Sequence, residues 1–258
     1  MAARAMWKAQ IHCGDAKVPI KMYAAIEDRS IRFRTLARQT GQPIRQAMVN
    51  PRTDEVVPHE EIRRAYIAEN GDRVILAPDE LAKLEPKASR EIRMVAFLPS
   101  GEIDHRWYER PYYLGPDGSS SAYFALAEAI DASGLEGLAH WVMRGKEYMG
   151  ALRLYHGYLM LMSLRHAGEV VAVEDLKAPG GSPLNPKELA MAQQLVGMLE
   201  SEFDLSNYQD AYRARVLELV QAKAKGTRLK LVKPTRKKPS DDLSDALQAS
   251  LQAMRKSA

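Results

Sequence analysis

The sequence predicts a mainly β fold with added α-helices, in which a β-rich body precedes a helical arm and a basic tail. Short apolar or alternating runs recur to about residue 173, with turn residues between them. This spacing is typical of a barrel or sandwich rather than a parallel α/β sheet. After the loop Ala178-Pro-Gly-Gly-Ser-Pro the apolar period changes to that of helices. The body contains no Gly-rich loop of the kind that binds phosphate between strand and helix.

Four runs predict strands in the body. Residues 11–23 alternate in part and contain a proline, and 73–76 form a short apolar run. Residues 91–98 place Ile92, Met94 and Ala96 on one face. Residues 158–164 are densely apolar, which indicates a buried strand. One helix is predicted over 122–131, because 119–121 are serines that can cap it and Gly134 lies just past its end.

Two helices are predicted in the arm. The first begins with Asn185 as N-cap, Pro186 at the first helical position and Glu188 at N3. Its apolar stripe comprises Leu189, Ala192, Val196 and Leu199. The second spans about 208–225, with a stripe of Tyr212, Val216, Leu219 and Val220. Both stripes need a cover, which is either the body or a second subunit.

The tail is basic and ends in a short helix. Residues 221–238 hold eight cations and no acid: Lys223, Lys225, Arg228, Lys230, Lys233, Arg236, Lys237 and Lys238. Prolines 234 and 239 favour an extended chain there. A helix over 241–256 follows, with an apolar stripe of Leu243, Leu247, Leu251 and Met254. A helix this short is marginal alone, so we expect it to dock on a partner protein or on the chain's own core.

Composition excludes several classes of protein. No run of about 18 apolar residues exists and the N-terminus has no secretory pattern, so we expect a cytoplasmic protein without a membrane span. The single Cys13 cannot form an internal disulfide, and no histidines pair at metal-ligand spacing, so neither metal nor cofactor is expected. No nucleophile motif or catalytic-cysteine signature occurs, and we expect no enzyme.

The charge distribution is more informative than the net charge of +4. Between Arg29 and Thr53 lie six arginines and no acid: Arg29, Arg32, Arg34, Arg38, Arg45 and Arg52. The planar guanidinium group suits phosphate pairs, although a solvated surface loop would give the same pattern. Few aromatic residues accompany these arginines, and no base-reading motif is visible. The stretch therefore predicts sequence-independent binding to duplex phosphates.

A series of motifs resembles bacterial Ku. Arg4-Ala-Met-Trp-Lys, Val18-Pro-Ile-Lys-Met-Tyr and Ile31-Arg-Phe-Arg-Thr-Leu stand at the start. Val57-Pro-His-Glu-Glu-Ile and Tyr66 follow, and Arg110-Pro-Tyr-Tyr-Leu-Gly-Pro is the most specific motif. The core ends with Arg144-Gly-Lys-Glu-Tyr-Met-Gly and Leu161-Met-Ser-Leu-Arg-His-Ala-Gly-Glu-Val. The resemblance covers about residues 2–230, in order and with fitting spacing.

The resemblance implies a dimeric ring that encircles broken duplex DNA. It implies a Ku-type β-barrel core over 1–178 with a DNA-encircling bridge at about 33–75, a dimerising helical arm over 179–228, and a basic linker and helix over 229–258. Implied partners are double-stranded DNA ends, an ATP-dependent DNA ligase of non-homologous end joining, and a second copy or a paralogue. Some relatives carry bridge cysteines that could hold zinc, but this chain has none there. The protein would act on the nucleoid.

The expected DNA-binding residues combine the bridge and the tail. They are Arg32, Arg34, Arg38, Arg45, Arg52, Arg63 and Arg64, with Lys230, Lys233, Arg236, Lys237 and Lys238. Two alternatives stay open. One is a lyase that processes DNA ends through a lysine Schiff base. The other is a protein-interaction module without end specificity.

Overall fold

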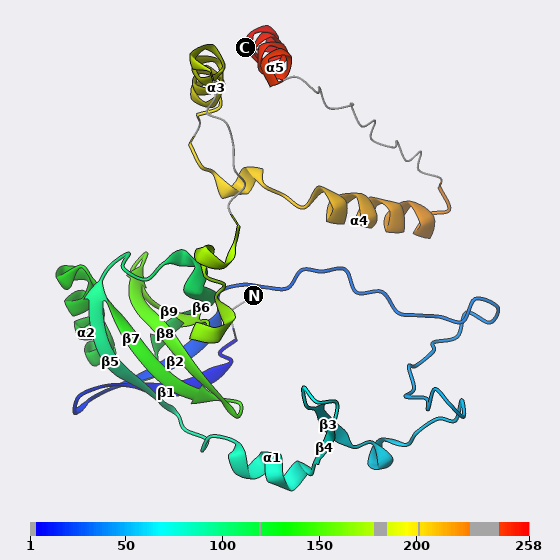
Figure 1. The fold of residues 1–258 in the computed structure, drawn as a ribbon. Coiled ribbons are helices and arrows are strands. Elements are labelled where there is room, and N and C mark those ends of the chain that lie inside the picture. Colours follow the sequence, from blue (N-terminus) through cyan, green and yellow to red (C-terminus); the bar gives the residue numbers. More distant parts are fainter. Residues whose placement is uncertain (1–3, 119, 178–184, 201, 228–242, 258) are drawn as a thin grey trace. The chain divides into compact units, whose positions relative to one another are not determined.

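The fold was derived from a computed structural model, which describes residues 4–118, 120–177, 185–200, 202–227 and 243–257. Two compact units divide the chain, Met1–Asp175 and Leu176–Ala258. Figure 1 shows the elements of both. The strands are β1 (Trp7–Cys13), β2 (Ala16–Ala24), β3 (Arg64–Ile67), β4 (Arg73–Leu76), β5 (Glu91–Pro99), β6 (Tyr108–Pro116), β7 (Leu135–Met143), β8 (Lys146–Tyr155) and β9 (Tyr158–Leu164).

The α-helices are α1 (Pro78–Leu84), α2 (Ser121–Ser133), α3 (Pro186–Met198), α4 (Ala211–Ala224) and α5 (Leu243–Ser257). Single 3-10 turns lie at His59–Glu61, His105–Trp107, Ala167–Glu169, Val173–Asp175 and Leu205–Asn207. No helix in the described part of the chain is long and apolar enough to cross a membrane.

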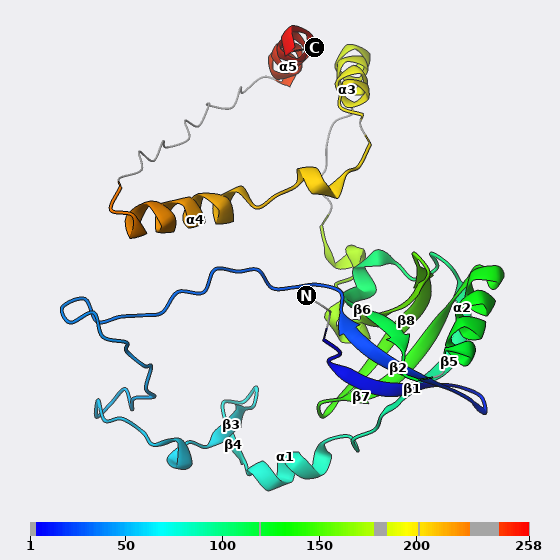
Figure 2. The same ribbon diagram turned by 180° about the vertical axis from the view of Figure 1, so that it is seen from behind.

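Seven strands close into a barrel in the order β1-β2-β6-β9-β8-β7-β5. Neighbouring strands are antiparallel except β1 and β5, which pair in parallel and close the sheet. Figure 2 brings β1 and β2 to the front of this barrel. Closure removes the free strand edges that would otherwise invite pairing with other chains. The predicted mainly β fold with a barrel is confirmed.

The interior of the barrel is apolar because alternate residues of its strands point inward. Ile11, Ile20, Leu114 and Leu161 are fully buried in one cluster that receives residues from β1, β2, β6 and β9. The densely apolar run at 158–164 is the buried strand β9, as predicted. In β5, Ile92 is buried and Met94 packs against the same cluster.

Helix α2 contacts β2, β7 and β8, and its inward residues join the core. The hydroxyl of Tyr123 donates a hydrogen bond to the Leu114 carbonyl at 2.6 Å and accepts one from the Leu159 amide at 2.9 Å. Leu114 and Leu159 face each other on β6 and β9, so one phenol ties the helix to two strands. The predicted end of the helix is confirmed, since Gly134 follows it with a φ of 65°.

A long excursion, residues 25–90, leaves the barrel after β2 and returns at β5. It contains β3, β4 and α1, and no residue of it is buried. The predicted bridge, 33–75, lies inside this segment. The strand expected at 73–76 is β4, which pairs with β3 in a two-stranded ribbon.

The structure adds two features of this unit that the sequence did not predict. The run 11–23 comprises parts of two strands, since Gly14, with a φ of 59°, turns the chain between β1 and β2. Helix α1 was not predicted, although Pro78 occupies its first turn and the Glu80 carboxylate accepts a hydrogen bond from the Ala77 amide at 2.8 Å.

In the second unit the predicted start of α3 is confirmed. The Asn185 side chain accepts a hydrogen bond from the Glu188 amide at 2.9 Å, and the Glu188 carboxylate accepts one from the Asn185 amide at 3.3 Å. Helix α5 packs against α3 and buries Leu251, which is 7% exposed. Helix α5 thus packs on the arm of its own chain, a docking site that the sequence did not predict.

Candidate DNA-binding surface

The seven bridge arginines predicted to bind DNA are all exposed. Among the described residues, no carboxylate pairs with Arg34, Arg38, Arg45, Arg52 or Arg64. Their guanidinium groups are therefore available to an external anion. Phosphate is the natural match, because the planar fork of arginine can donate two hydrogen bonds to it.

Two of the seven already have partners within the chain. Arg32 forms an ion pair with Asp28 at 3.3 Å. Hydrogen bonds from Ser30 and from Arg32 hold the pKa of Asp28 down, to about 2, so this carboxylate stays charged at neutral pH. Arg63 donates to the carbonyl oxygens of Glu60, at 2.7 Å, and Ile62, at 3.3 Å. The structure thus separates Arg32 and Arg63 from the five unpaired arginines.

Arg38 and Arg52 each lie in a tight turn. An isolated antiparallel β-bridge closes each turn. It joins Leu36 to Pro43 in the first turn and Val49 to Val56 in the second. Arg64 instead lies on β3, opposite Leu76 of β4. The five remaining predicted residues, Lys230, Lys233, Arg236, Lys237 and Lys238, lie outside the described residues.

Large apolar side chains are exposed beside these arginines. In the excursion, Phe33 is 71% exposed and Met48 is 69% exposed, and the others that are exposed up to the second turn are Ile26, Leu36, Ile44, Val49 and Val56. Sequence reasoning singled out the cations here and missed this apolar set. Apolar clusters that a single chain leaves exposed mark interaction surfaces.

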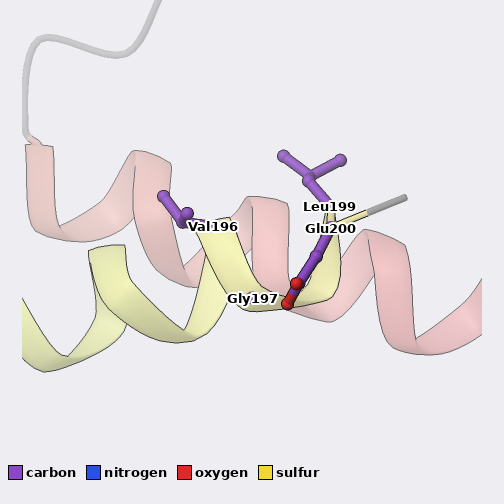
Figure 3. A pocket seen from close by; sticks show the side chains of 4 residues that line it. All are labelled: Val196, Gly197, Leu199 and Glu200. Atoms are coloured by element: carbon purple, nitrogen blue, oxygen red, sulfur yellow. The ribbon is translucent and has the colours of Figure 1, made fainter. Parts of the chain in front are cut away.

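The arm has a second exposed apolar set. Figure 3 shows Val196 and Leu199 near the C-terminal end of α3, where they line a shallow depression with Gly197 and Glu200. Both belong to the predicted stripe of α3, and Val196 is 70% exposed. Of the predicted stripe only Ala192 is half-buried, and the other half-buried residues of α3 are Glu188, Met191, Leu195 and Met198. Helix α4 likewise has no buried residue, and Tyr212 of its predicted stripe is 69% exposed.

Among the described residues, no group of three or more His, Cys, Asp and Glu side chains lies close enough to hold a metal ion.

Comparison with known proteins decides the family. A family model described as the Ku70/Ku80 beta-barrel domain matches residues 12–191. The chain belongs to the Ku family. The match covers most of the barrel strands and all of the excursion, and it confirms the resemblance drawn from the sequence motifs.

Curated relatives from the Ku family match nearly the whole chain. The non-homologous end joining protein Ku 2 of Geotalea uraniireducens is 34% identical over 253 residues, which are 97% of this chain and 98% of that protein. The non-homologous end joining protein Ku 3 of Saccharopolyspora erythraea is 36% identical over 248 residues, 94% of each chain. The non-homologous end joining protein Ku of Bacillus subtilis is 32% identical over 97% of this chain and 82% of that protein.

Proposed function

We propose that this protein binds the ends of double-stranded DNA without sequence preference, as a dimeric ring, in non-homologous end joining. The observation that carries the proposal is the set of exposed, unpaired arginines on the excursion of a chain that belongs to the Ku family. The relatives are named for non-homologous end joining, which makes DNA-end binding the role the family supports. A protein in this role works on the nucleoid in the cytoplasm.

The proposed contacts are electrostatic. Arg34, Arg38, Arg45, Arg52 and Arg64 are free to donate to phosphates, whereas Arg32 and Arg63 must exchange a partner within the chain for a phosphate. The five cations at 230–238 add affinity that is independent of sequence. Backbone contacts of this kind position a duplex without reading its bases.

A second copy of the chain is the partner that best fits the exposed apolar surface. The excursion and the arm both expose large apolar side chains, such as Phe33, Met48, Val196 and Tyr212. A dimer would bury them and would supply the second half of a ring. We assign the barrel to 1–178, the bridge to about 33–75, the dimerising arm to 179–228 and the tail to 229–258. Whether the second copy is identical or a paralogue is decided by sizing the purified protein alone.

The test of end binding compares one DNA in two forms. A closed ring can load on a linear duplex only at its ends, so relaxed closed-circular DNA of the same sequence should compete poorly. We expect the protein to shift the linear form and to leave most of the circular form free at physiological salt. Equal affinity for both forms would refute ring loading. A linear duplex blocked at both ends by a bulky group controls for shape.

An ATP-dependent DNA ligase is the proposed downstream partner. Its test is the rate of end ligation with and without the protein, and with a variant that ends after residue 242 and lacks α5. Loss of stimulation with DNA binding retained would assign the ligase contact to the C-terminal helix. Unchanged stimulation would place the contact elsewhere on the chain.

A further inference from the structure

Two turns of the excursion have the same backbone. In turn 1, residues 35–44, the Ala37 amide donates to the Gln42 carbonyl at 2.8 Å and the Ile44 amide donates to the Thr35 carbonyl at 3.1 Å. The Gly41 amide closes the loop on the Ala37 carbonyl at 2.8 Å. Gly41 is in the left-handed region, with a φ of 68°.

Turn 2, residues 48–57, repeats each of these bonds at a constant offset along the sequence. The Asn50 amide donates to the Glu55 carbonyl at 2.9 Å and the Val57 amide to the Met48 carbonyl at 2.8 Å. The Asp54 amide closes the loop on the Asn50 carbonyl at 2.9 Å, and Asp54 has a φ of 57°. The two turns are therefore copies of one geometry with different side chains.

Their charges differ in sign. Turn 1 carries Arg38 and no acid, and Arg34 and Arg45 flank it directly. Turn 2 carries Arg52 together with the two carboxylates of Asp54 and Glu55. All of these side chains are exposed. Neither carboxylate of turn 2 forms an ion pair with Arg52 in the described structure, so all three charges face solvent.

This difference in net charge determines whether each turn attracts or repels the phosphates of DNA. At physiological salt the screening length is about 8 Å, so charges on one short turn are only partly screened from one another, and a nearby phosphate interacts mainly with their net charge. Around turn 1 the sum is positive and rises further with the two flanking arginines. Around turn 2 the two carboxylates outweigh Arg52 and repel a phosphate.

We propose that turn 1 is the phosphate-contacting element of the bridge and that turn 2 is not. The inference rests on the proposed DNA-end binding and sharpens it by ranking its residues. Arg38, with Arg34 and Arg45, contacts the duplex backbone. Arg52 offsets the carboxylates of its own turn and makes little contact with DNA.

The test uses the two turns as matched controls in the full chain. Arg38→Gln and Arg52→Gln each remove one guanidinium group from the same backbone geometry. Arg38→Gln should weaken binding to linear duplex about tenfold, as one lost charge-assisted contact would. It should also lower the slope of log affinity against log salt by about 0.9 for each subunit of the ring that carries the change. Arg52→Gln should change affinity less than about twofold. An equal or larger effect of Arg52→Gln would overturn the ranking.

Two further variants test separately the charge of turn 2 and the backbone conformation that positions Arg38 in turn 1. Asp54→Asn removes one carboxylate from turn 2 and keeps a residue that tolerates the left-handed region, so affinity should rise about twofold. Gly41→Val keeps Arg38 but strains turn 1, because a β-branched residue rarely adopts a positive φ. Gly41→Val should weaken binding as Arg38→Gln does. Wild-type binding by Gly41→Val would show that the turn backbone does not present Arg38.

The outcomes separate this inference from the proposed function. If the parent protein binds linear and closed-circular DNA equally, the ring proposal fails whatever the ranking of the variants. If the parent keeps its preference for linear DNA but Arg38→Gln and Arg52→Gln act alike, only the inference about turn 1 fails. Circular dichroism and thermal melting of each variant check that the barrel is intact.

Discussion

The barrel and the excursion are parts of one compact unit, yet they differ in how their apolar side chains are placed. In the barrel, Ile20 and Leu161 are fully buried, and β1 and β5 close the sheet. In the excursion no residue is buried, and Phe33 is 71% exposed. The barrel gains its stability from its own core, whereas the excursion, in which residues are at most half-buried, gains much less from burial within the described chain. The exposed side chains of the excursion are the ones that our proposal assigns to DNA and to a second copy of the chain.

The largest expected effect comes from breaking the barrel. Leu161→Ala removes a fully buried side chain from β9 and leaves a cavity between strands. It should lower the free energy of unfolding by about 2–5 kcal/mol. Denaturant titration followed by tryptophan fluorescence measures this, since Trp141 belongs to the same core. A loss below about 1 kcal/mol would mean that this part of the core is loosely packed.

The next effect comes from the hydroxyl that joins α2 to the barrel. Tyr123→Phe deletes both hydrogen bonds of the phenol and leaves the Leu114 carbonyl and the Leu159 amide without this partner. The free energy of unfolding should fall by about 1–3 kcal/mol, because these two buried backbone groups lose a hydrogen-bond partner. Thermal melting of the variant checks this. Tyr158→Phe, at an exposed position next to Leu159, is the matched control and should leave the melting temperature almost unchanged.

Phe33→Ala should weaken the association of two chains and leave the stability of the barrel unchanged. Because Phe33 is exposed in one chain, the barrel should melt as before, with a change within about 0.5 kcal/mol. If a second copy covers Phe33, the dimer should dissociate about tenfold more readily, as for a contact of moderate energy at an interface. Sedimentation over a range of concentrations measures both species. A dimer of unchanged strength would remove Phe33 from the interface.

Asp28→Asn should give the smallest effect. It frees Arg32 from its ion pair and raises affinity for linear duplex by less than about fivefold, since ion pairs between exposed side chains are weak. The pKa of Asp28 is lowered to about 2, so the pair is present above the usual carboxyl pKa of 3.8 and is lost only as pH falls toward 2. Binding assays between pH 6 and 8 should therefore show no pH dependence from this pair. Weaker DNA binding by the variant would assign Asp28 a supporting role.

Sequence reasoning succeeded where one pattern has one structural solution. The apolar run of β9, the C-terminal Gly134 of α2 and the capping pair Asn185 and Glu188 all occupy their predicted places. It failed for α1, which is only two turns long and carries no apolar stripe that becomes buried. Periodicity also could not choose between neighbouring faces of α3, because both are apolar. Leu195, outside the predicted stripe, lies on the half-buried face.

The sequence identified the arginines of the candidate site but not their partners within the chain or the geometry of the turns that carry them. A count of arginines cannot show that Arg32 is paired with Asp28 or that Arg63 donates to carbonyl groups. The shared geometry of the two turns also had no sequence signal, since Gly41 in one turn and Asp54 in the other occupy the same left-handed position. Only the backbone hydrogen bonds reveal that these turns are equivalent.

The pairing of β1 with both β2 and β5 has an evolutionary consequence. The excursion starts at the end of β2 and finishes at the start of β5, and these two strands flank the same central strand. No ladder pair of the barrel strands involves residues 25–90, and the ends of the excursion bond to the barrel through the Ala25 amide, which donates to the Pro111 carbonyl, and the Arg90 carbonyl, which accepts from the Gln10 amide. Insertions, deletions or a wholly different segment could be exchanged at these two points while the barrel stays constant. Selection can therefore change the sequence and length of the excursion while the core residues that stabilise the barrel stay the same.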